Sequence, residues 1–232
     1  MGQGGTDFWR GFRCGVPIVV GYVPIALAFG VLAKTGGIPL WGAALLSGVV
    51  FAGSSQFMAL ALLGGGAGVG EIVLATFLVN FRNFLMSASL AARLPGVRGA
   101  LRWLLAFGVT DEVFSLVSLR ERAPSPMEVL GLEVAAYGSW VGGTVGGFVA
   151  GEFLGDTLRA SLGIAIYAMF VGLLVPAVRR LPRRGAVAFL AGGFHLGLAA
   201  LPGVSSSAAL VGGIVLGSLA GAWGYQGEGE GA

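Results

Sequence analysis

Long stretches without a charged side chain constrain this chain more than any other feature. The stretches that lack Asp, Glu, Lys and Arg cover residues 14–33, 35–70, 134–151, 160–178 and 185–227. Each is long enough for a spanning helix of about 20 residues, and two are long enough for a pair. Because the stretches are continuously apolar rather than alternating, they disfavour a transmembrane barrel. The pattern predicts an all-α polytopic membrane protein with the lipid bilayer as its solvent.

Composition and charge exclude several other classes of protein. Only 11% of the residues are charged, against about 25% in a typical soluble domain. The net charge of +3 does not indicate a nucleic-acid partner, because the basic residues cluster at the ends of the apolar stretches, as in membrane-flanking loops. The single cysteine, Cys14, excludes an intrachain disulfide, and no cluster has metal-ligand spacing. We therefore expect no metal and no cofactor.

Turn-forming residues divide the apolar stretches into a bundle of about eight expected spanning helices, with seven as the alternative count. The expected spans are residues 14–33, 40–63, 70–91, 103–119, 131–150, 160–178, 186–201 and 206–224. Counting Lys and Arg in the loops favours a cytoplasmic N-terminus. Residues 1–225 are expected to form one integral membrane domain, followed by a disordered tail over 226–232.

Glycines repeat every four residues in two of the expected spans. The repeats are Gly138, Gly142 and Gly146; Gly143, Gly147 and Gly151; and Gly213, Gly217 and Gly221. Small residues let helix backbones approach closely in lipid, so the repeats predict tight packing within the chain or against a partner.

The second expected span is interrupted near its centre by Gly53, Ser54, Ser55 and Gln56. Glycine and serine weaken a helix, and transporters use breaks at this depth to point free backbone N–H groups at an anion. We therefore predict a broken helix near Gly53 to Ser55. In the alternative, the serines bond to their own helix and Gln56 binds a neighbouring helix.

The third expected span carries Arg82 at its centre and a polar stripe along one side. The stripe is Thr76, Asn80, Asn83 and Ser87, and at 100° per residue it is about 60° wide. Such a stripe faces protein or water rather than lipid. Arg82 is too deep to reach the interface, so a partner anion is expected.

The fourth expected span places Asp111 and Glu112 at its centre. Ionisable groups at this depth are costly and indicate a functional site. Two acids against Arg82 leave one carboxylate in excess, which is either protonated or paired with a cationic ligand. A purely structural ion pair is the alternative, although it leaves the second acid unexplained. Glu71 and Glu133 fall near span ends and are expected to reach the interface.

A site with a spare carboxylate, a helix break and several small polar groups suits a zwitterion. The ammonium is expected at Asp111 or Glu112, and the carboxylate at Gly53 to Gln56 or at Arg82. A channel or pore for a small polar solute or ion shares the polar residues and remains the alternative. An enzyme is disfavoured, because the serines have only the distant His195 as a base.

Three segments together resemble the signature of the AzlC family, the large subunit of bacterial branched-chain amino acid exporters. The segments are residues 51–57 (FAGSSQF), 80–90 (NFRNFLMSASL) and 110–114 (TDEVF). The resemblance implies proton-driven efflux of branched-chain amino acids across the bacterial cytoplasmic (inner) membrane, together with a small AzlD-type membrane subunit. Asn83 departs from the His or Tyr of many relatives, which leaves proton coupling to Asp111 or Glu112.

The chain is thus expected to be a transporter subunit and not an enzyme. Substrate binding is assigned to Gly53, Ser54, Ser55, Gln56, Asn80, Asn83 and Asp111. Proton coupling is assigned to Asp111 and Glu112, and Arg82 is expected to form a charge pair with one of them.

Overall fold

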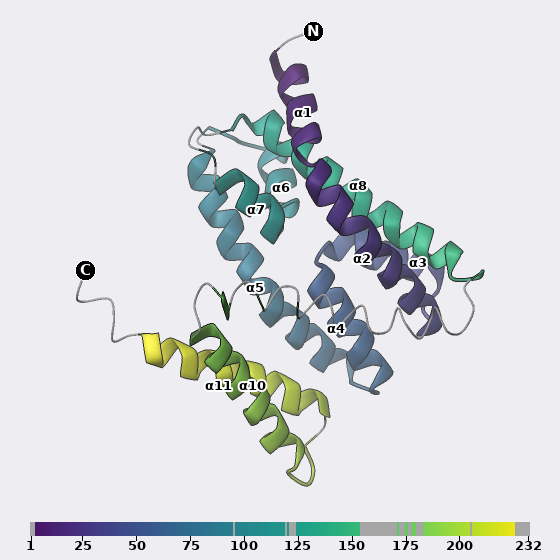
Figure 1. Ribbon diagram of the computed structural model, residues 1–232, viewed down its shortest axis with the longest axis vertical. Coiled ribbons are helices and arrows are strands. Elements are labelled where there is room, and N and C mark those ends of the chain that lie inside the picture. Colours follow the sequence, from purple (N-terminus) through teal and green to yellow (C-terminus); the bar gives the residue numbers. More distant parts are fainter. Residues whose placement is uncertain are drawn as a thin grey trace. The chain divides into compact units, whose positions relative to one another are not determined.

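The computed structural model describes residues 3–94, 96–118, 120, 124–153, 171, 175, 178–179, 183–204 and 206–225. Across these residues the regular structure is helical, with no strand, as expected from the apolar stretches (Figure 1). The first helices are α1 (Gln3–Cys14), α2 (Val16–Thr35), α3 (Leu40–Leu45), the π-helix η1 (Leu46–Val50), α4 (Gly53–Gly64) and α5 (Val69–Arg93). The remaining helices are α6 (Ala100–Phe107), α7 (Asp111–Ser118), α8 (Pro126–Ala150), α10 (Arg183–Ala199) and α11 (Ser206–Tyr225).

The chain divides into two compact units. Unit 1 comprises Met1–Phe57 and Leu78–Ala165, and unit 2 comprises Met58–Phe77 and Ile166–Ala232. The polar residues assigned to the site all lie in unit 1. The single domain over 1–225 stays a prediction, and the tail 226–232 lies outside the described residues.

Two of the described helices, α2 and α5, are long and apolar enough to cross a bilayer by length and composition. The second expected span is divided among α3, η1 and α4, and the fourth between α6 and α7. Of the expected span 160–178, only residues 171, 175 and 178 are described. The number of spanning helices therefore stays a prediction.

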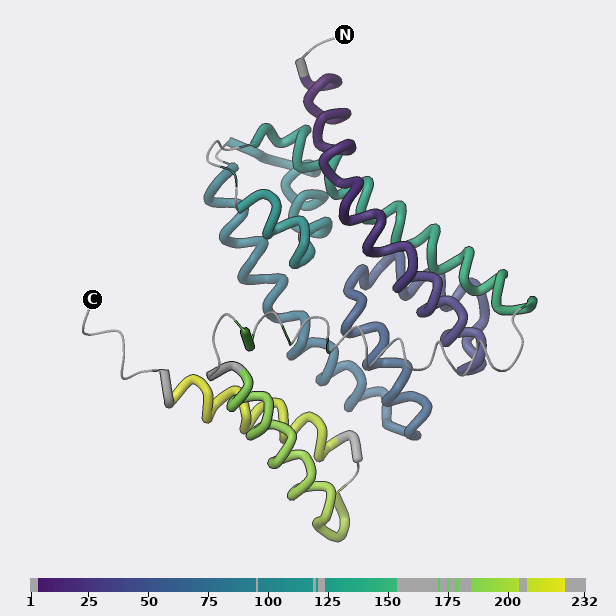
Figure 2. The backbone as a smooth tube through the Cα atoms, viewed as in Figure 1, coloured from purple at the N-terminus to yellow at the C-terminus, as the bar shows by residue number. Residues whose placement is uncertain are grey.

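Helices α1 and α2 form one nearly continuous rod that lies along α8 (Figures 1 and 2). The backbone stays hydrogen-bonded on both sides of Gly15, since Gly15 N donates to Gly11 O and Val19 N donates to Gly15 O. The first expected span begins at residue 14, so α1 was not predicted.

Glycines set the distance between this rod and α8. A Cβ atom added to Gly147 would lie 2.1 Å from the carbonyl oxygen of Leu27, and one added to Gly30 would lie 2.1 Å from that of Thr144. Gly138 and Gly142 of the other repeat have no atom within 4 Å of an added Cβ. Only one of the two glycine stripes of α8 is thus closely packed within the described part of unit 1.

In unit 2, α10 and α11 pack against each other through the third glycine repeat. A Cβ on Gly217 would lie 2.7 Å from Cα of Ala191, and one on Gly213 would lie 2.9 Å from Cβ of His195. His195 thus packs against the neighbouring helix.

Candidate functional site at two helix breaks

The first helix break falls at Phe51 and Ala52, directly before Gly53. Phe51 has φ 43° and ψ 45°, in the left-handed region that a bulky residue rarely adopts. Its ring is 3% exposed and contacts the ring of Tyr137, with centroids 5.1 Å apart. Packing of this ring holds the break in place, in agreement with the interruption expected near Gly53 to Ser55.

A buried polar network fixes the two ends of this break to α8. Gln56 Nε2 donates to Ser47 Oγ at 3.0 Å, and Trp140 Nε1 donates to Gln56 Oε1 at 2.9 Å. Ser47 Oγ also lies 2.7 Å from Thr144 Oγ1. The nitrogen and the oxygen of the Gln56 amide are thus both hydrogen-bonded, and Gln56 is 1% exposed. Gln56 thus binds a neighbouring helix, which is the alternative that the sequence left open for it.

A second break separates α6 from α7 at Gly108, Val109 and Thr110. The expectation of one continuous span over 103–119 is wrong here. Glycine and two β-branched residues in succession are poor helix formers, and Val113 N lies 3.4 Å from the Thr110 hydroxyl as in an N-cap. The signal was present in the sequence, because a threonine followed by two acids is typical of a helix start.

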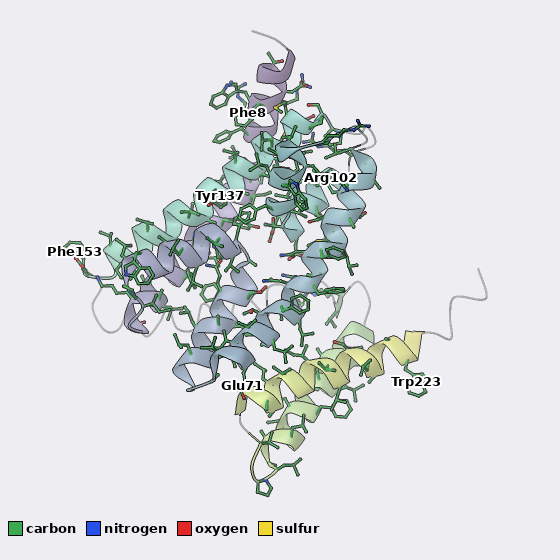
Figure 3. All side chains as sticks on the ribbon, turned by 180° about the vertical axis from the view of Figure 1, so that it is seen from behind. Phe8, Glu71, Arg102, Tyr137, Phe153 and Trp223 are labelled. Carbon is green, nitrogen blue, oxygen red and sulfur yellow. The ribbon has the colours of Figure 1, made fainter. Side chains whose placement is uncertain are left out.

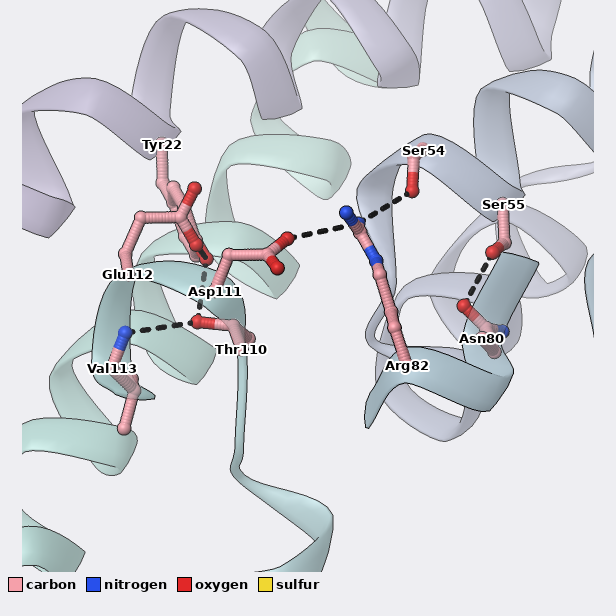
Figure 4. Close-up of polar contacts among 9 residues, drawn as sticks. All are labelled: Tyr22, Ser54, Ser55, Asn80, Arg82, Thr110, Asp111, Glu112 and Val113. Carbon is pink, nitrogen blue, oxygen red and sulfur yellow. Dashed lines mark hydrogen bonds and ion pairs between the residues drawn. The ribbon is translucent and has the colours of Figure 1, made fainter. Parts of the chain in front are cut away.

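The two breaks bring an ion pair together in unit 1. Arg82 Nη2 on α5 lies 2.8 Å from Asp111 Oδ2 at the start of α7, and it donates to Ser54 Oγ at 3.1 Å at the start of α4 (Figure 4). The side chains of Arg82 and Asp111 are 46% and 40% exposed. Both side chains of the pair are therefore partly exposed in the described structure.

Glu112 points away from this pair toward α2. Its carboxylate accepts a hydrogen bond from the hydroxyl of Tyr22, and the same hydroxyl lies 2.9 Å from Thr110 Oγ1 (Figure 4). Tyr22 is 9% exposed. Tyr22 was not among the predicted site residues, although it is the only hydroxyl side chain in the first apolar stretch, 14–33.

Further contacts hold α5 against α6 and α7. Ser87 Oγ donates to the carbonyl of Ala106 at 3.0 Å. Arg93 donates to the carbonyls of Val117 and Arg120 at 3.0 and 2.9 Å, as a cation near a helix C-terminus does.

The other assigned residues lie around this centre. Asn80 accepts a hydrogen bond from the buried Ser55. Gly53 lies beneath Trp140, where an added Cβ would be 2.6 Å from Cη2 of the indole. For Asn83, no side-chain hydrogen bond is formed within the described residues. Their assignment to substrate binding stays a prediction.

Helix α8 contributes a second polar stripe, whose members were not among the predicted site residues. Glu133, Tyr137, Trp140 and Thr144 recur at i, i+4, i+7 and i+11, the spacing of one helix face. Tyr137, labelled in Figure 3, donates to the carbonyl of Gly48 in η1 at 2.9 Å. Glu133 is 3% exposed, so the expectation that it reaches the interface is wrong.

An ion pair outside the expected spans joins the ends of α2 and α8. Lys34 Nζ lies 2.8 Å from Glu152 Oε1. The hydrogen bond from Lys34, together with its positive charge, holds the pKa of the Glu152 carboxyl below its ordinary value.

The chain is similar to one protein family and to several known proteins. A family model described as AzlC protein matches residues 17–154, a range that contains both helix breaks. An uncharacterized membrane protein of Archaeoglobus fulgidus is 37% identical over 195 residues, covering 82% of this chain and 85% of the relative. Inner membrane protein YgaZ of Escherichia coli is 31% identical over 224 residues, covering 93% and 90%.

A more distant relative carries a functional name. The branched-chain amino acid transport protein AzlC of Bacillus subtilis is 28% identical over 115 residues, covering 48% of this chain and 45% of the relative. No solved structure matches the chain significantly.

Proposed function

This chain belongs to the AzlC family of membrane transport proteins, and we propose that it exports branched-chain amino acids as the large subunit of a proton-coupled carrier. The observation that supports this most directly is the half-exposed contact among Ser54, Arg82 and Asp111. Transporters build midplane sites from such discontinuous helices. The name of the Bacillus subtilis relative supports the substrate class.

Substrate binding is proposed to occur by insertion of the zwitterion into the ion pair. The substrate carboxylate binds the Arg82 guanidinium and the Ser54 hydroxyl, which already lie 3.1 Å apart. The substrate ammonium pairs with the Asp111 carboxylate, which Arg82 releases. While the substrate is bound, both protein charges have a partner, which avoids the cost of an isolated ion in lipid. Asn80, Asn83, Gly53, Ser55 and Gln56 shape the surroundings in this scheme.

Proton coupling is proposed to use the two acids of the second break. Asp111 can hold either the substrate ammonium or a proton, because both neutralise the same carboxylate. Glu112, held by Tyr22, provides the second proton-binding group. Mutually exclusive binding is what antiport requires, and loading of the acids then shifts the population between inward-open and outward-open states.

The proposal includes the inner membrane as location, a cytoplasmic N-terminus and a small AzlD-type subunit as partner. The first two draw on the name of the Escherichia coli relative and on the distribution of Lys and Arg. The partner is implied by the resemblance of the three signature segments.

The test is leucine flux from proteoliposomes that hold this chain with its small partner, with and without an imposed pH gradient. Wild type is expected to export faster with the gradient, and Asp111→Asn is expected to fold but lose export. Asp7→Asn is the control, because Asp7 pairs with Arg10 in α1, outside the site. Equal flux with and without the gradient would contradict proton coupling, and full activity of Asp111→Asn would contradict the site.

A further inference from the structure

Glu133 is a buried carboxyl group that the proposed transport cycle leaves unused. It lies in α8, its side chain is 3% exposed, and neither carboxyl oxygen has a hydrogen-bond partner within the described residues. The other three members of its stripe, Tyr137, Trp140 and Thr144, each have one. Glu133 is thus the exception on a face that otherwise satisfies its polar atoms.

The carboxyl group lies directly against the second helix break. A Cβ atom added to Gly108 would be 2.5 Å from both Cδ and Oε2 of Glu133. A larger residue at position 108 would therefore force the Glu133 side chain or its helix to shift. The same break continues through Val109 and Thr110, and Asp111 and Glu112 follow directly as the first residues of α7. Glu133 thus touches the segment that leads into the site.

No charged group on the packed helices neutralises Glu133. Helix α8 packs against α1, α2, α3, η1, α6 and α7, of which α3 and η1 contain no titratable residue. The paired titratable groups on the others and on α8 are Asp7 with Arg10, Lys34 with Glu152, Arg82 with Asp111, Tyr22 with Glu112, and Arg120 with Glu128. Tyr137 donates to a backbone carbonyl, and Arg13, Cys14 and Arg102 form no ion pair with Glu133 in the described structure.

An unpaired carboxylate in such a place is costly unless it carries a proton. A structural role would not need an acid here, since an uncharged side chain of similar volume fills the space at lower cost. Intramembrane acids of this kind mark proton pathways in pumps and transporters.

We propose that Glu133 is a further proton-binding residue of the transporter, protonated in the conformation seen here. It releases the proton to water when the α6–α7 break moves away from α8 and admits solvent to the carboxyl group. This inference rests on the proposed proton-coupled export. It adds to Asp111 and Glu112 an acid that does not contact the substrate.

The first test compares wild type, Glu133→Gln and the control Glu152→Gln in proteoliposomes with the small partner. Glutamine keeps the shape of the protonated acid but cannot release a proton. Glu133→Gln is expected to retain leucine exchange at equal pH on both sides and to lose the acceleration by a pH gradient. Glu152→Gln, at the exposed end of α8, is expected to keep both. A wild-type response to the gradient in Glu133→Gln would overturn the proposal.

A second measurement needs no variant and no transport. An apolar carbodiimide, which modifies protonated carboxyl groups, is added to wild-type protein in membranes over a range of pH, and modified residues are located by mass spectrometry. Glu133 is expected to be modified at neutral pH and less so at alkaline pH. A Glu133 that stays unmodified at every pH never meets the medium in protonated form, which overturns the proposal. If wild-type flux ignores the gradient, the proposed coupling fails, while this labelling still reports on Glu133.

Discussion

At the scale of single residues, Asp111 and Glu112 adjoin in sequence but meet different partners. They are 100° apart around α7, so Asp111 meets Arg82 of α5 and Glu112 meets Tyr22 of α2. In the proposed cycle, the half-exposed Asp111 exchanges its partner for the substrate. Glu112, bonded to the largely buried Tyr22 hydroxyl, is proposed to bind a proton.

The buried amide network gives a prediction at the same scale. Trp140→Phe removes the donor to Gln56 Oε1, which is 2.9 Å away. The amide oxygen of a side chain that is 1% exposed is then left without a partner, so the free energy of unfolding should fall by about 1–3 kcal/mol. Thermal unfolding in detergent measures this. Trp9→Phe is the control, because Trp9 is 59% exposed; equal melting temperatures for the two variants would contradict the role of the network.

At the scale of elements, α8 is the helix on which both breaks depend. It packs under Gly53 at the first break through Trp140, and against Gly108 at the second through Glu133. The close packing of α2 on α8 in turn requires small residues at the contact. A displacement of α8 should therefore disturb both breaks together.

The glycine repeats of α8 offer a matched pair of substitutions. Gly147→Ala places a Cβ 2.1 Å from the carbonyl oxygen of Leu27, whereas Gly142→Ala meets nothing within 4 Å. Overpacking of this kind costs about 1–3 kcal/mol, so Gly147→Ala should unfold at lower temperature and lose transport. Gly142→Ala should be neutral in the isolated chain. If Gly142→Ala alone impairs transport when the small partner is present, that face of α8 contacts the partner.

At the scale of the whole molecule, the question is whether the contact among Ser54, Arg82 and Asp111 belongs to a carrier or to a pore. Both need polar residues at membrane depth, but only a carrier returns its site after each transport event. We predict that unlabelled leucine on the far side accelerates the efflux of labelled leucine at equal pH, because the loaded site returns faster than the empty one. An efflux rate that does not respond to leucine on the far side would favour a pore.

The lipid environment, the helical class, one helix break and the family could be predicted from sequence alone. The uncharged stretches determine that the solvent is lipid and the elements are helices, because burial of backbone polar groups in lipid leaves few other choices. The residues Gly53 to Ser55 indicate a break, the depth of Arg82 requires an acid, and the three signature segments indicate the family. Each of these follows from neighbours along one helix or from composition.

Other features depend on which helix faces meet, and only the tertiary structure decides that. Arg82 selects Asp111 rather than Glu112 because α5 lies on one side of α7, and Tyr22 joins the site because α2 lies on the other. Glu133 looks like an interfacial acid in sequence, but it is buried where α8 lies against Gly108. Hydropathy and periodicity are properties of local sequence, whereas the partner of a charge is set by contacts between helices that are distant along the chain.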